Sequence, residues 1–118
     1  MITFIAKKKL MSKEEDLLVN SIIKGIEEVK GHEVVLMDLQ SITQSISDYF
    51  IICSGDSPIQ VRAIVDSIEK TVKETTNELP WKIEGMQNRQ WVIMDYFDIV
   101  VHVFHKDWRS FYRLEDLW

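Results

Sequence analysis

The amino-acid sequence predicts a single-domain α/β fold, with a mixed β-sheet packed with helices. Short apolar runs rich in β-branched residues alternate with segments whose apolar residues recur at helical spacing. The chain has 118 residues, of which 46% are hydrophobic, so there is material for one core and little room for a second domain. We expect the order α-β-β-α-β-β-β-α.

The first helix is predicted to begin after Ser12. Ser12 and Glu15 have the spacing of a capping box, in which each side chain accepts a hydrogen bond from a backbone N–H group at the start of the helix. Apolar residues then recur at helical spacing: Leu18, Ile22, Ile26 and Val29. Gly31 is expected to end the helix, because glycine readily adopts the left-handed conformation that follows a last turn.

Two strands are predicted next, over 34–37 and 49–53. Both segments are apolar throughout, which favours strands covered on both faces. The polar stretch from Gln40 to Ser47 is predicted to be a loop.

The second helix is expected to run from Ser57 to about Thr76. Ser57 is a typical N-cap, Pro58 suits the first helical position, and Gln60 would complete a second capping box. One face of this helix is apolar and carries Val61, Ile64, Val65, Ile68 and Val72.

The last part of the chain is predicted to form three strands and a helix. A short strand over 81–84 would end at Gly85, and segments 90–95 and 98–104 lie close enough in sequence to form a hairpin. Asp107 is expected to cap a final helix from Trp108 to about Leu117.

The hairpin is predicted to have one mixed face. With a turn at Tyr96-Phe97, side-chain alternation puts Val92, Met94, Val101 and Val103 on a plain core face. The other face receives Trp91, Ile93, Asp95, Asp98, Val100, His102 and Phe104. A tryptophan among apolar and polar groups is typical of an interface hot spot. The alternative is that a helix or loop covers this face and that Trp91 belongs to the core.

Composition limits the classes of partner. The net charge is −5 and the pI about 5.1, which disfavours nucleic acid and anionic membranes and favours a neutral or basic partner. The single cysteine, Cys53, is expected to be a buried free thiol. Residues 1–10 lack the order of a secretory signal, and no apolar run is long enough to span a bilayer, so we expect a cytoplasmic protein.

The sequence offers little for catalysis. The Gly55-Asp56-Ser57 turn before a helix could hold an anion, although ordinary helix capping explains the same residues. His32, His102 and His105 lack the spacing of a zinc site, so no metal is expected. Asp95 and Asp98 flank a turn, and nothing in the sequence positions a substrate beside them.

Several segments together resemble the ribosomal silencing factor (Iojap-like) family. They are Asp48-Tyr49-Phe50-Ile51-Ile52, Ser54-Gly55-Asp56-Ser57, Glu84-Gly85, Trp91-Val92-Ile93-Met94-Asp95, Val101-His102-Val103-Phe104 and Phe111-Tyr112-Arg113-Leu114-Glu115-Asp116-Leu117-Trp118. The resemblance covers residues 12–118, the expected domain, and leaves residues 1–11 as a lead that we expect to be flexible. Three segments depart from the family pattern. Asp56 stands where asparagine is commoner, Tyr96-Phe97 replaces a glycine-containing turn, and Trp108-Arg109-Ser110 varies from the usual glutamate- and arginine-rich lead into the last helix.

The resemblance implies a nucleotidyltransferase-like fold without the catalytic carboxylates. It also implies that the protein is not an enzyme and needs no cofactor. The expected activity is binding to ribosomal protein L-fourteen of the large subunit, which blocks subunit joining when nutrients are short, and the protein is expected to form a homodimer. We therefore expect the partner-binding residues to be Trp91, Ile93, Asp95, Val100, His102 and Glu84. A nucleotide-binding or nucleotidyltransferase-type enzyme is the alternative, and direct sequence-specific contact with nucleic acid is not expected.

Overall fold

A computed structural model describes residues 2–4, 12–40 and 47–112. Its elements, in chain order, are β1 (Ile2–Phe4), α1 (Lys13–Glu28), β2 (His32–Asp38), β3 (Tyr49–Gly55), α2 (Pro58–Thr76), β4 (Lys82–Glu84), β5 (Trp91–Asp95), β6 (Ile99–His105) and α3 (Lys106–Tyr112). The strands form one mixed sheet in the order β1-β2-β3-β6-β5-β4. The α/β class and the elements expected from Ser12 onward are therefore confirmed.

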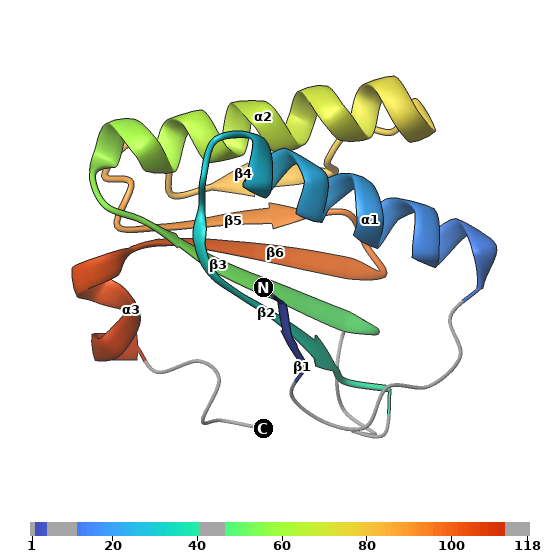
Figure 1. The fold of residues 1–118 in the computed structure, drawn as a ribbon, viewed down its shortest axis with the longest axis horizontal. Coiled ribbons are helices and arrows are strands. Elements are labelled where there is room, and N and C mark those ends of the chain that lie inside the picture. The colour runs from blue at the N-terminus through green and yellow to red at the C-terminus, as the bar shows by residue number, and fades with distance from the viewer. Residues whose placement is uncertain (1, 5–11, 41–46, 113–118) are drawn as a thin grey trace.

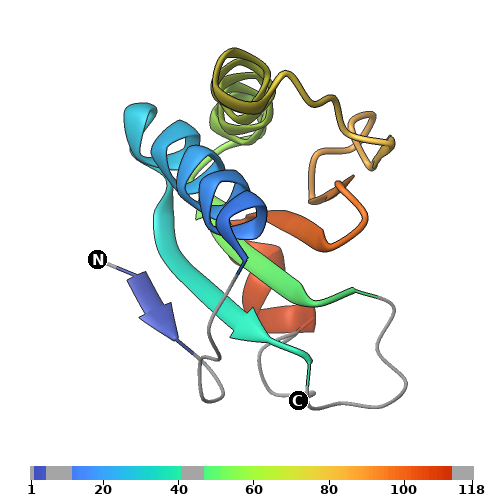
Figure 2. The ribbon, with the colours of Figure 1, turned by 90° about the vertical axis from the view of Figure 1, so that its right-hand side faces the viewer.

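The sheet has helices α1 and α2 side by side over one face (Figures 1 and 2). The short helix α3 does not join this layer and lies at the far end of β6 (Figure 1). Strands β3 and β6 pair in parallel at the centre, and β5 and β4 follow as antiparallel neighbours. The first residues of β3 and β6 therefore lie side by side at one end of the sheet, and their last residues lie side by side at the other end.

One strand was not predicted. β1 pairs in parallel with β2, with Ile2 opposite Val34, in the segment where we expected a flexible lead. Three residues are too few to give a periodic pattern, and such a strand is held by the edge of its neighbour rather than by its own sequence.

The start of α1 is as predicted, but its end differs. Ser12 accepts from the Glu15 backbone N–H (3.1 Å), and Glu15 accepts from the Ser12 backbone N–H (3.3 Å). The residue in the left-handed conformation is Lys30 (φ 60°) rather than Gly31. Gly31 serves a packing role instead, because a Cβ there would lie 2.5 Å from the Ile26 side chain.

Helix α2 also begins at the predicted cap, with one difference. Ser57 accepts from the Gln60 backbone N–H (3.1 Å), and Pro58 is the first helical residue. The Gln60 side chain does not return to Ser57 and accepts from the Asp56 N–H (2.6 Å) instead. Its amide group donates to the carbonyls of Val29 and Lys30, so Gln60 ties the end of α1 to the start of α2.

Helix α3 begins earlier than predicted. It starts at Lys106, so Asp107 lies in its first turn and is not the cap. The Asp107 N–H donates to His105 Nδ1 (3.2 Å), which gives the imidazole the role that we assigned to aspartate. The predicted continuation beyond residue 112 lies outside the described residues.

Side-chain alternation along the strands produces two apolar clusters. The larger lies between the sheet and helices α1 and α2, and includes the expected core face of the hairpin, Val92, Met94, Val101 and Val103. The smaller lies on the opposite face and contains Val35, Met37, Leu39, Ile52 and Phe104, with Phe50 and Trp91 partly buried against it. The central strands are therefore covered on both faces, as their continuous apolar sequences predict.

The β5–β6 hairpin has a register that differs by two residues from the prediction. Trp91 faces Phe104 rather than His102, and Asp95 faces Val100 rather than Asp98. The turn is wider because Phe97 adopts a left-handed conformation (φ 71°), and Asp95 Oδ1 accepts its N–H (2.8 Å). Because side chains alternate with period two, a shift of two leaves every strand residue on its predicted face. Asp98, which we expected on the Trp91 face, instead precedes β6 and lies with Glu15 and Asp48.

Replacing Gly25 by alanine should destabilise the domain, because helices α1 and α2 pack tightly at this residue. A Cβ on Gly25 would lie 2.6 Å from Thr71 Oγ1 and 2.8 Å from Ile68 Cα. We expect Gly25→Ala to lower the free energy of unfolding by roughly 1–3 kcal/mol through this overpacking. This result would be opposite in sign to the gain of about 1 kcal/mol that alanine gives over glycine in an exposed helix.

Chemical denaturation of Gly25→Ala and Asn20→Ala would test this packing. Asn20 is exposed on the same helix, so its replacement should leave stability unchanged or slightly higher. A Gly25→Ala protein as stable as the Asn20→Ala control would contradict the close packing of the two helices.

Candidate protein-binding face

The candidate binding face is built on β5 and β6, on the side of the sheet away from α1 and α2. Trp91 is the first residue of β5 and is held in place by the loop before it. Gly85 (φ 92°) lies so close to the Trp91 carbonyl that a Cβ there would overlap it. The Glu84-Gly85 pair that contributed to the family resemblance is thus a geometric requirement for bringing the chain into β5.

Trp91 packs on two residues of β6. Its ring stacks on Phe104 with centroids 5.2 Å apart, and its indole N–H donates to His102 Nδ1 (3.0 Å). The ring of Phe50 meets the His102 ring edge-on at 4.5 Å. These contacts fix the orientation of the indole while leaving it half-buried, so Trp91 is neither a free surface residue nor a fully buried core residue.

The expected site residues divide into two groups. Trp91, Ile93 and Asp95 are half-buried, and Glu84 is exposed on the neighbouring strand β4, where it forms an ion pair with Lys82 (2.7 Å). Val100 and His102 are only 6% and 4% exposed. The side chains of the first four residues are accessible, whereas Val100 and His102 are buried beneath that surface.

His102 is uncharged in the folded protein. Burial lowers the pKa of its imidazole to about 3, far below the ordinary 6.5. Since Nδ1 accepts the Trp91 indole N–H, the imidazole proton must lie on Nε2. Nε2 is buried and has no hydrogen-bond partner among the described residues. The face is therefore apolar at its base, with acidic groups at its edge.

The Gly55-Asp56-Ser57 turn is occupied by the protein's own groups. Gln60 Oε1 accepts the Asp56 N–H, and Ser57 Oγ accepts the Gln60 N–H. The Asp56 carboxylate lies 3.0 Å from His32 Nε2. A cavity of about 380 Å³ adjoins the turn, and it is lined by Glu33 and Asp56 as well as by His32 and Lys106. These contacts favour ordinary helix capping over anion binding.

Arg109 supports the same end of the sheet. Its guanidinium is buried and donates to the Glu33 carbonyl (2.6 Å) and to Ser54 Oγ (2.7 Å).

Cys53 is a fully buried free thiol, as predicted. Burial raises the pKa of Cys53 to about 12, so the group is a neutral thiol and a poor nucleophile at physiological pH.

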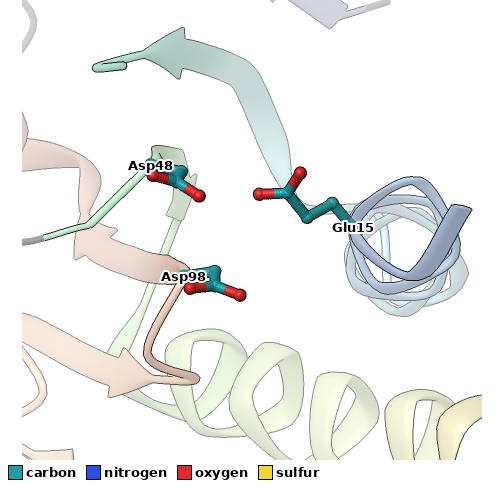
Figure 3. A group of neighbouring side chains, drawn as sticks. All are labelled: Glu15, Asp48 and Asp98. Atoms are coloured by element: carbon teal, nitrogen blue, oxygen red, sulfur yellow. The ribbon is translucent and has the colours of Figure 1, made fainter. Parts of the chain in front are cut away.

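Three carboxylates meet at the opposite end of the sheet. Glu15, Asp48 and Asp98 point toward one another (Figure 3), with carboxylate oxygens within 4.8 Å. Burial, and next the hydrogen bond with Asp48, raise the pKa of Glu15. We did not predict this group. Asp48 and Asp98 each immediately precede an apolar strand in the sequence, but they meet only because β3 and β6 pair in parallel.

The positions of these groups argue against a nucleotidyltransferase site. Gly55 ends β3, whereas Asp48 precedes its first residue. A strand of seven residues spans about 20 Å. A phosphate at the turn would therefore lie far from any metal held by the three carboxylates. The remaining aspartate of the hairpin, Asp95, lies on the Trp91 face and does not join them.

Comparisons with known proteins agree with this description. A crystal structure of a Chromobacterium violaceum protein matches with a TM-score of 0.81 and 31% identity, covering 92% of this chain and 87% of the other. The fold is thus that of a known class of small α/β proteins. A family model described as "Ribosomal silencing factor during starvation" matches residues 11–118, and the chain belongs to this family.

Two curated relatives carry the same name, ribosomal silencing factor RsfS. The Halalkalibacterium halodurans protein is 39% identical over 92% of this chain and 89% of its own length. The Bacillus subtilis protein is 42% identical over 75% of this chain and 74% of its own length. The resemblance from residue 12 onward is therefore confirmed as family membership. Among the described residues, no helix is long and apolar enough to cross a membrane.

Proposed function

We propose that this protein silences ribosomes by binding the large subunit through ribosomal protein L-fourteen and blocking the joining of the small subunit. Membership of the ribosomal silencing factor family carries this proposal. The repression would act in the cytoplasm when nutrients are short. No cofactor or metal takes part in this proposal, and the protein acts by occupying a surface rather than by catalysis.

The proposed contact is the half-buried tryptophan face. Trp91 and Ile93 supply apolar contact, Asp95 supplies negative charge beside it, and Glu84 adds a carboxylate that is paired with Lys82. A buried tryptophan surrounded by a polar rim is typical of residues that dominate binding energy. The chain has a net charge of −5, which favours approach to a basic ribosomal protein and disfavours direct binding to RNA. His102 and Val100 support Trp91 from beneath.

Sedimentation of purified ribosomal subunits through a sucrose gradient tests the function. With the protein present, we expect it to travel with large subunits and the fraction of joined ribosomes to fall. Protein that stays at the top of the gradient, with joining unchanged, would overturn the proposal. Sedimentation of the free protein would show whether it forms the homodimer that the resemblance implies.

The nucleotide-binding alternative has less support. The turn donors are already used, and the carboxylates lie at the other end of β3. Isothermal calorimetry with ATP and Mg²⁺ is expected to give no heat of binding. Micromolar, magnesium-dependent binding would favour the enzyme alternative instead.

A further inference from the structure

A second surface lies at the end of the hairpin remote from Trp91. Three large apolar side chains are exposed there: Leu79 (64%), Trp81 (65%) and Phe97 (61%). The rings of Trp81 and Phe97 lie 5.4 Å apart. We call these three residues the aromatic patch. Single exposed apolar residues are ordinary, but a group with two aromatic rings is typical of an interaction site.

The aromatic patch is held by the sheet rather than by a loose loop. The Trp81 N–H donates to the Asp95 carbonyl (2.7 Å), and the Phe97 N–H donates to Asp95 Oδ1 (2.8 Å). The backbones of both aromatic residues are thus held by the last residue of β5, and their rings lie against each other. Rigid aromatic groups lose little conformational entropy on binding, so this arrangement is suited to recognition.

An acidic cavity is lined by residues that are next to the aromatic patch in the chain. It has a volume of about 330 Å³, and its lining includes the carboxylates of Glu15, Asp48 and Asp98. Phe97 lies between Tyr96 and Asp98 in the chain, and Leu79 follows Glu78. Tyr96, Asp98 and Glu78 all line the cavity as well.

The described lining of the cavity carries negative charge without a matching cation. Within the described part of the chain, no lysine, arginine or histidine lines it. The three carboxylates in Figure 3 face one another, so their repulsion would be relieved by a positive group placed between them. Apolar and acidic surfaces side by side define the chemistry of the partner.

We propose that the aromatic patch and the acidic cavity together bind a basic protein segment. An arginine or lysine of that segment enters the cavity, and an adjacent apolar side chain packs on Trp81 and Phe97. A bare metal ion would leave the aromatic patch unused, and nucleic acid would be repelled by the carboxylates. A second copy of this chain has a net charge of −5 and so does not match the charge of this cavity. This surface is separate from the Trp91 face and does not depend on the ribosomal proposal.

Selection from a random peptide display library against the full chain tests this inference. We expect the selected peptides to carry arginine or lysine next to leucine or an aromatic residue. Fluorescence anisotropy of a selected peptide should show binding weakened at least about tenfold by Trp81→Ala and by Phe97→Gly. Phe97→Gly is a mild change for the fold, because glycine readily adopts the left-handed conformation of this residue.

Charge and position supply the controls. Asp98→Asn should weaken peptide binding and reduce its dependence on salt, because one carboxylate of the cavity is neutralised. Ile59→Ala, an exposed apolar residue of α2 (79%), should leave binding unchanged. The proposal is overturned if no peptide is selected or if the selected peptides lack basic residues. It is also overturned if Trp81→Ala and Phe97→Gly alter only self-association of the free chain.

Discussion

Trp91→Glu is expected to weaken binding to the large ribosomal subunit by more than about 30-fold, which corresponds to about 2 kcal/mol. Trp91 lies half-buried over His102 and Phe104, at the centre of the proposed contact. A glutamate removes the apolar area and would have to be dehydrated against the partner. Co-sedimentation over a range of subunit concentrations measures the loss.

A second variant separates binding from folding. Trp91 also packs on the smaller cluster, so its replacement reduces stability as well. Ile93 lies on the same face and is directly opposite Glu84 on β4. Ile93→Lys therefore places a lysine beside a carboxylate within the sheet, while it presents a positive charge to a basic partner. We expect this variant to remain folded and to lose binding.

A control variant is available on the other side of the molecule. Ile59→Lys changes an apolar side chain that is 79% exposed on α2, and it should bind like the unchanged protein. If Ile93→Lys is folded by circular dichroism and binds with unchanged affinity, this face is not the contact. If Trp91→Glu alone fails to fold, the alternative in which Trp91 is chiefly a core residue gains support.

The elements and faces that follow from local sequence were predictable. Ser12 and Ser57 cap α1 and α2 through bonds within four residues, and the apolar runs of β2 and β3 reflect burial on both faces. The face of the hairpin that carries Trp91 was also predictable, because alternation with period two survives an error of two residues in register.

Features set by contacts between distant segments were not predictable. The carboxylates of Glu15, Asp48 and Asp98 meet because β3 and β6 pair in parallel and α1 begins beside them. The burial of His102 depends on contact with Phe50, which comes from another strand. It also depends on the register of the hairpin, which is set by the wider turn at Phe97. This burial lowers the pKa of His102 to about 3, and no pattern in the sequence indicates it.

The stability of the domain should fall in mild acid because His102 is buried as a neutral group. Its folded pKa is about 3 and its unfolded pKa is near 6.5, so between these values the unfolded chain binds a proton that the folded chain does not. The contribution of this group is fully present above pH 6.5 and is lost progressively as the pH falls toward 3. Between pH 7 and pH 5 the loss should be about 2 kcal/mol.

His102→Asn should remove this part of the pH dependence. Asparagine has an acceptor near the position of Nδ1, so it can still receive the Trp91 indole N–H, but it does not titrate. In urea denaturation at pH 7 and pH 5, we expect the unchanged protein to lose about 2 kcal/mol more than the variant. Protonation of Nδ1 would make it a donor that faces the indole N–H donor of Trp91. Acid should therefore also break the hydrogen bond between Trp91 and His102. Equal losses in the two proteins would show that His102 is not buried as a neutral group.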